Sequence, residues 1–260
     1  MKIYRINALL LKYYYITMAK LDRQFDIFFW PIIMLLIWGF TSKYVITLSG
    51  NNTILSIFLG GVILWTFFQR SVNDVSIYFL EDFWSRNIKN LFTTPIKESE
   101  LVIATSIFAV IKSFLSFIFL FLIAFFGYKF NLFDTGILKV TLFIIPLLIA
   151  GWAIGLMIAA FVFLYGQRIS IFAWAFSFLL QPIGAVFYPV TILPNILQKI
   201  SFFTPIMHIF EGFRGTFNNA FSLYHLSWAF GLAIVYLILG YYLLGRAINK
   251  SRKSGFLTTN

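Results

Sequence analysis

Two stretches of this sequence stay apolar for longer than the strands or helices of a water-soluble domain usually do. Residues 115–127 contain no charged side chain, and neither do residues 144–163. About 20 consecutive apolar residues are needed to cross a bilayer as a helix. Only 11% of the chain is charged, against about 25% in soluble domains. The apolar runs do not alternate with polar residues, which disfavours a β-barrel. We therefore expect an all-α polytopic membrane protein.

Six spans are predicted within one transmembrane domain that covers residues 1–260. They are residues 27–48, 53–78, 101–128, 137–165, 169–188 and 224–244. Residues 247–260 then form a cytoplasmic tail. No uninterrupted apolar run precedes a cleavage site near the N-terminus, so we expect no signal peptide to be removed.

The lysines and arginines give the orientation. With both termini in the cytoplasm, 14 of the 20 basic residues lie on the inner side and Lys112 lies within a span. The outer side receives Lys43, Lys129, Lys139, Lys199 and Arg214. This asymmetry follows the positive-inside rule and predicts a bacterial-type inner or plasma membrane location. It also accounts for the net charge of +11 through contacts with anionic lipid, so no nucleic-acid partner is expected.

Residues 1–22 form a predicted interfacial helix. Apolar residues recur between Ile3 and Ile16 at near-helical intervals, with Arg5 and Lys12 between them and Lys2 and Lys20 on either side. Such a pattern is typical of a helix that lies in the inner membrane interface. The alternative is a loose run of basic residues that only signals orientation.

Sites for covalent chemistry or metal binding are scarce. The chain has no cysteine, and the spacing of His208 and His225 does not make a metal site. We expect Lys112 to extend its amine to the inner interface. Arg70 and Asp74 are four residues apart, so we expect them to pair on one helix face. No catalytic or cofactor-binding residue is predicted, and this scarcity also counts against proton- or sodium-coupled transport.

One dense polar segment, Glu81 to Glu100, separates the second and third spans. A short helix over residues 82–94 is predicted. Its apolar residues are Trp84, Ile88, Leu91 and Phe92, and its charged residues are Asp82, Arg86 and Lys89. Thr94 and Pro95 are predicted to begin the next helix, with Glu98 and Glu100 in its first turn. The segment is either a docking surface for a partner or an interfacial helix that anchors the loop.

Prolines divide the region after the fifth span. Pro189, Pro194 and Pro205 leave pieces too short to cross the membrane, which predicts short re-entrant helices over residues 190–215 at the outer face. Glu211 and Arg214 are three apart and are expected to pair there. The alternative to a functional role is that this pair only holds the loop in place.

A face of small residues, Gly151, Gly155 and Ala159, lies within the fourth span. Small residues at this spacing let two helices approach closely. The face is expected to pack inside one subunit, with contact between two copies as the alternative.

Two stretches resemble the type-2 permease subunits of ATP-binding-cassette (ABC) exporters. These are "RNIKNLFTTPIKESELVIA" after the second span and "GAVFYPVTILPNILQKISFFTPIMHIFEGFR" before the last. "FFWPIIMLLIWGF" is similar to the start of the first span in the same permeases. The likeness covers residues 3 to about 246, and the order and spacing of the motifs carry it.

The resemblance implies roles for these segments. Residues 82–94 would be the coupling helix that docks on an ATPase, and Pro189, Pro194, Pro205, Glu211 and Arg214 would belong to the outer gate. Residues 3–20 would be the interfacial connecting helix. Two ATPase subunits and a second permease copy, a homodimer in the simplest assembly, are implied. No Gly-x-x-x-x-Gly-Lys-Ser/Thr motif occurs, so ATP and Mg²⁺ would bind the partner ATPase.

The implied function is export of a lipophilic or lipid-linked substrate. Polysaccharide or glycan export is the alternative within the same class. A membrane-embedded lipid-modifying enzyme and a structural or assembly protein are alternatives outside it. The Phe-rich composition fits a lipophilic substrate, but Phe is also an ordinary lipid-facing residue.

Overall fold

The computed structural model describes residues 2–51, 53–84, 94–165, 170–217 and 220–253. Within these ranges the chain is helical, without strands. Five helices are long and apolar enough to cross a membrane. They are α2 (Leu21–Ser49), α3 (Thr53–Trp84), α5 (Glu98–Tyr128), α6 (Ile137–Tyr165) and α10 (Leu223–Lys253). The prediction of an all-α polytopic membrane protein is confirmed.

The remaining helices are shorter. They are α1 (Ile3–Ala19), η1 (Leu132–Thr135), α7 (Ser170–Ile183), η3 (Val190–Ile192), α8 (Asn195–Phe202) and α9 (Pro205–Phe217). α7 falls within the predicted fifth span, but its 14 residues are fewer than a membrane crossing needs. The count of six spans therefore stays a prediction.

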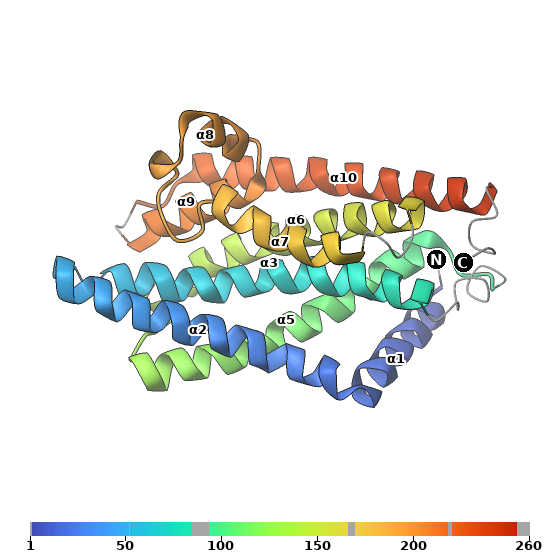
Figure 1. Ribbon diagram of the computed structural model, residues 1–260, viewed down its shortest axis with the longest axis horizontal. Coiled ribbons are helices and arrows are strands. Elements are labelled where there is room, and N and C mark those ends of the chain that lie inside the picture. Colours follow the sequence, from blue (N-terminus) through green and yellow to red (C-terminus); the bar gives the residue numbers. More distant parts are fainter. Residues whose placement is uncertain (1, 52, 85–93, 166–169, 218–219, 254–260) are drawn as a thin grey trace.

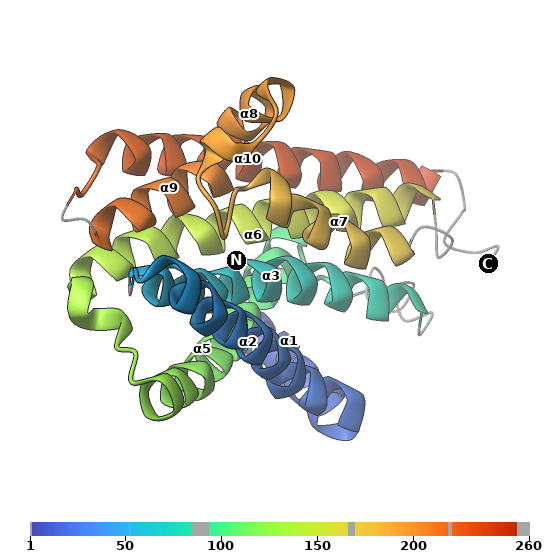
Figure 2. The ribbon, with the colours of Figure 1, turned by 60° about the vertical axis from the view of Figure 1, so that its left-hand side comes forward.

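α6 lies at the centre of the bundle, between α3 on one side and α10 on the other (Figures 1 and 2). Close approach to α3 depends on two glycines. A Cβ atom on Gly151 would lie 2.4 Å from the Cβ of Ser71, and one on Gly155 would lie 2.9 Å from the backbone oxygen of Val72. The small-residue face thus packs inside the subunit, as expected.

Both ends of the described chain lie at one end of the bundle (Figure 1). The end of α3 and the start of α5 lie there too, and the start of α5 lies beside the first residues of α1. α8 and the start of α9 lie toward the opposite end, and α8 projects from the side of the bundle (Figure 1). The two ends of the polar segment and the short helices of residues 190–215 therefore lie in different parts of the bundle.

The prediction that the helix of the third span begins at Thr94 and Pro95 is wrong, because α5 begins at Glu98. Lys97 keeps extended backbone angles, and its N–H donates to the Glu100 carboxylate at 3.0 Å. Pro95 lies in a turn, and its carbonyl accepts a hydrogen bond from Arg5. The Glu100 carboxylate therefore accepts the hydrogen bond of a free backbone N–H at the start of the helix, a role that was expected of Thr94. Glu98 and Glu100 do occupy the first turn.

Candidate functional site

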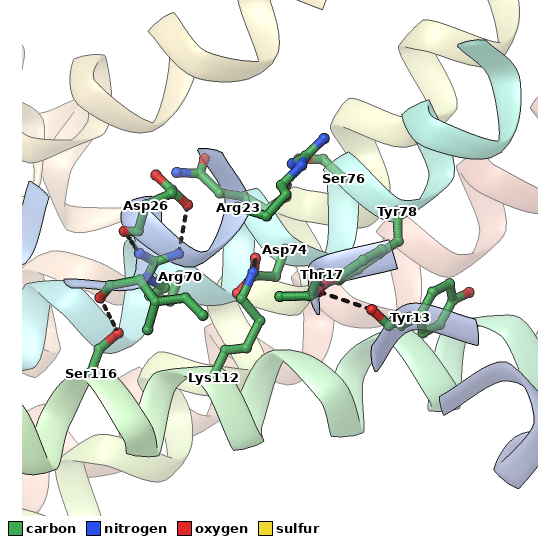
Figure 3. A network of polar contacts seen from close by, with 12 residues as sticks. Tyr13, Thr17, Arg23, Asp26, Arg70, Asp74, Ser76, Tyr78, Lys112 and Ser116 are labelled. Atoms are coloured by element: carbon green, nitrogen blue, oxygen red, sulfur yellow. Dashed lines mark hydrogen bonds and ion pairs between the residues drawn. The ribbon is translucent and has the colours of Figure 1, made fainter. Parts of the chain in front are cut away.

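A group of charged side chains is buried where α2, α3 and α5 meet (Figure 3). Arg70 of α3 donates from Nη1 to Oδ2 of Asp26 in α2 at 2.7 Å. Its Nη2 donates to the backbone oxygen of the same residue. Both guanidinium contacts therefore fix α3 against the start of α2.

The second buried pair joins α3 to α5. Nζ of Lys112 lies 2.5 Å from Oδ1 of Asp74, and the two side chains are 5% and 1% exposed. The amine also lies 5.6 Å from the centre of the Tyr78 ring. Buried charges that lack a partner are expensive, so this pair holds two helices in one register.

Two expectations about these charges are wrong. Arg70 and Asp74 do not pair with each other, and Lys112 does not extend to the interface. α3 places Arg70 and Asp74 one turn apart, next to two different neighbouring helices. Each side chain therefore finds its partner across a helix interface and not along its own helix.

Hydroxyl groups extend the network to α1 (Figure 3). The hydroxyls of Thr17 and Tyr78 lie 2.9 Å apart, and Thr17 also donates to the Tyr13 carbonyl at 2.9 Å. Ser116 donates to the Ile27 carbonyl at 2.7 Å, which joins α5 to α2. Through these contacts α3 is tied to α1, α2 and α5.

The acids at the two ends of the polar segment are both held by residues in or directly beside α1 and α2. Glu81, near the end of α3, accepts hydrogen bonds from Lys20 and, at 2.8 Å, from Arg23. Glu100, at the start of α5, is fully buried. It accepts from the N–H of Lys2 at 2.9 Å and lies 3.5 Å from Arg5. α1 therefore connects the two stems of the segment.

The predicted docking residues lie between these stems. Asp82 and Trp84 belong to the last turn of α3. The other five fall outside the described residues: Arg86, Ile88, Lys89, Leu91 and Phe92. Their docking role stays a prediction.

Short helices follow α7, as the prolines predicted, and their location on the outer side stays a prediction. Pro189 precedes η3, Pro194 precedes α8 and Pro205 begins α9. A proline suits the start of a helix because no intrahelical hydrogen bond is lost there. A gating role for these prolines stays a prediction.

Glu211 and Arg214 pair at 3.0 Å, as expected. Glu211 also accepts from the N–H of Val190 at 2.6 Å. Arg214 donates to the carbonyls of Ala185 and Val186 at 2.8 and 3.2 Å. The pair therefore fastens α9 to the segment that follows α7.

The two histidines meet although they are 17 residues apart in sequence. Nδ1 of His208 lies 3.2 Å from Nδ1 of His225, and Nε2 of His208 lies 2.9 Å from the Phe202 carbonyl. Burial lowers the pKa of His208 below its ordinary value. In the described part of the chain, no group of three or more His, Cys, Asp or Glu side chains could hold a metal ion.

Sequence reasoning overlooked a polar face of α3. Thr66, Gln69, Arg70 and Asn73 recur at the three- and four-residue spacing of one helix face. Four polar residues at this spacing inside an apolar span were the available signal. Asp26 of α2 is the other missed residue.

Comparison with known proteins gives two results. Residues 40–242 match the ABC-2 family transporter proteins. The chain is also 30% identical over 127 residues to the inner membrane transport permease YadH of Escherichia coli K12, and equally to its counterparts in E. coli O157:H7 and Shigella flexneri. That alignment covers 44% of this chain and 49% of the relative, so the chain spans about half the length of the curated relatives it matches.

Proposed function

The chain belongs to the ABC-2 family of transporter proteins, and we propose that it is the membrane subunit of an ATP-driven exporter. In this proposal two copies form the permease and two separate ATPase subunits bind its cytoplasmic face. Each copy crosses the membrane six times, α7 and the residues around it forming the fifth span. Both termini face the cytoplasm.

The observation that carries this proposal is the linkage between the polar segment and the interior of the bundle. Glu81 and Glu100 anchor the two stems to α1 and α2. Further along the same two helices, Asp74 and Lys112 join α3 to α5. A force on the polar segment would therefore move α3 and α5 together and carry α1 with them.

ATP hydrolysis is assigned to the partner because this sequence lacks a P-loop motif. Closure of the ATPase pair would push residues 82–94. The second and third spans would then tilt and open an outward route. The side chains of this subunit supply position and packing, and ATP with Mg²⁺ stays on the partner.

The substrate we propose is a lipophilic or lipid-linked compound. The bundle exposes many large apolar side chains, among them Leu122, Phe126 and Ile238, and a lipid-borne substrate can approach along such a surface. The described part of the chain offers no metal cluster, and its buried acids are committed to ion pairs. These features favour transport over lipid chemistry.

Coexpression with a partner ABC ATPase subunit tests the proposal. The variants are Trp84→Ala and Ile88→Asp on the predicted docking helix. The control is Asn249→Asp, which adds the same charge as Ile88→Asp to an exposed position near the end of α10. We expect both docking variants to reach the membrane but to lose co-purifying ATPase and ATP-dependent transport, while the control retains both. Normal assembly with full transport in both docking variants would refute the docking role.

A further inference from the structure

A cavity of about 120 Å³ opens between α2, α3 and α7. Its lining combines two charged residues, two amides and two aromatic rings: Asp26, Arg70, Gln69, Asn73, Trp30 and Phe178. Three of these side chains lie on the polar face of α3 described above. The polar face of α3 therefore forms one wall of the cavity.

A second cavity of about 370 Å³ adjoins the first, since Asp26 and Trp30 line both. It follows α2 toward its first turn, where Asp22 and Arg23 line it. Asp26 lies five residues after the start of α2, or about 7.5 Å along the helix axis. The second cavity therefore lies at the end of the bundle where the start of α2 meets the end of α3.

The charges that line the first cavity pair with each other, and in the second cavity Arg23 is paired while Asp22 is exposed at the rim. Arg70 gives both of its terminal nitrogens to Asp26, and Arg23 pairs with Glu81. An anionic ligand would bring a further negative charge close to Asp26, and a cation would meet the Arg70 guanidinium. The lining therefore favours a ligand without net charge.

The two amides are available for a ligand. Gln69 and Asn73 line the cavity and are partly buried, and their side-chain amides make no hydrogen bond to another side chain or carbonyl among the described residues. An amide group both donates and accepts, and leaving it unpaired against lipid is unfavourable. Trp30 and Phe178, 55% and 41% exposed, place aromatic surface beside these amides.

We propose that this cavity binds the uncharged, hydroxyl-bearing headgroup of a glycolipid-type substrate. Sugar hydroxyl groups can donate to and accept from the amides of Gln69 and Asn73, and they can donate to the Asp26 carboxylate. The indole of Trp30 offers a flat surface for the apolar face of a sugar ring. The exposed aromatic rim places the lipid chains toward the bilayer. This inference rests on the proposed transport of a lipid-linked compound and names its headgroup.

Photocrosslinking of the full chain in lipid nanodiscs, without ATPase, tests the inference. The probes are three photoreactive diacylglycerol lipids that differ only in a glucose, phosphocholine or phosphate headgroup. Mass spectrometry quantifies the labelled peptides of α2 and α3. We expect the glucosyl probe to label these peptides most strongly.

Gln69→Leu and Asn73→Leu should each reduce that labelling about fivefold, because each removes one neutral hydrogen bond. Both leave the pair of Asp26 and Arg70 intact, and size-exclusion chromatography checks that the variants fold. Asn249→Leu is the control because this exposed amide of α10 lies outside both cavities, and it should not change labelling.

Equal labelling by the three probes, a preference for the phosphate or phosphocholine probe, or unchanged labelling in both amide variants would overturn the inference. None of these outcomes bears on ATPase docking, which is measured in a separate complex. Conversely, loss of the docking role would leave the headgroup preference measurable on the permease alone.

Discussion

Replacing Lys112 with Met should destabilise the helix bundle strongly. The amine lies 2.5 Å from Oδ1 of Asp74, and both side chains are at least 95% buried. Oδ2 of Asp74 already lacks a hydrogen-bond partner among the described residues. Without Lys112 the carboxylate is left buried and unpaired. Removing one member of a buried ion pair costs about 3–5 kcal/mol of unfolding free energy.

Removing both charges should restore most of that stability. In the double variant Asp74→Leu with Lys112→Met, apolar side chains of similar volume replace the pair. Such replacements are often neutral or stabilising. The two single substitutions should therefore be strongly non-additive, with a coupling energy of about 3 kcal/mol or more.

Equilibrium unfolding by sodium dodecyl sulfate in mixed micelles, followed by tryptophan fluorescence, measures these free energies. Lys43→Met is the matched control. Lys43 is exposed, and its amine lies 4.9 Å from the Tyr128 ring, an arrangement worth about 0.5–1 kcal/mol. A cost for Lys112→Met no larger than that of the control, or additive costs in the double variant, would refute the reasoning.

Three further predictions concern packing, the N-terminal helix and pH. Gly151→Ala should cost about 1–3 kcal/mol, because its Cβ would meet the α3 backbone. Gly231→Ala, with nothing within 4 Å, should be neutral or stabilising, and thermal unfolding in detergent compares the two. Glu100→Gln should weaken the contact between α1 and α5, so limited trypsin digestion should cut faster at Arg5; an unchanged cleavage rate would contradict this. Since burial lowers the pKa of His208, the unfolded chain binds protons first as pH falls. Stability should therefore decrease below the ordinary pKa of about 6.5. His208→Gln should show a smaller drop in Tm between about pH 7.5 and 5.5, where His titrates, and an equal drop would contradict the assignment.

Several elements follow directly from local sequence. The run from 144 to 163 is too apolar and too long for anything but a buried or membrane helix, and it lies within α6. The prolines at 189, 194 and 205 each begin or precede a short helical piece because a proline cannot continue the helix before it. Glu211 and Arg214 are close enough on one helix to pair without help from the rest of the fold.

The partners of the buried charges could not be found in this way. In a span that is apolar on every side, periodicity does not separate the face that meets lipid from the face that meets another helix. Arg70 and Asp74 satisfy the spacing rule for a pair on one helix, yet Asp26 and Lys112 approach each of them from outside. Likewise, Glu100 and not Thr94 accepts the hydrogen bond at the start of α5, and the same carboxylate is held by the residues at the start of α1.

The sequence by itself determined that this chain crosses a membrane, which apolar runs form its long helices, and that short helices follow the prolines at 189, 194 and 205. These properties depend on hydropathy and backbone geometry over one or two helical turns. Only the tertiary structure decided which charges pair, which glycines let α6 approach α3, and that Gln69 and Asn73 share a cavity with Trp30. Those outcomes depend on which helices become neighbours, and contacts between residues 38 or more positions apart leave no local pattern to read.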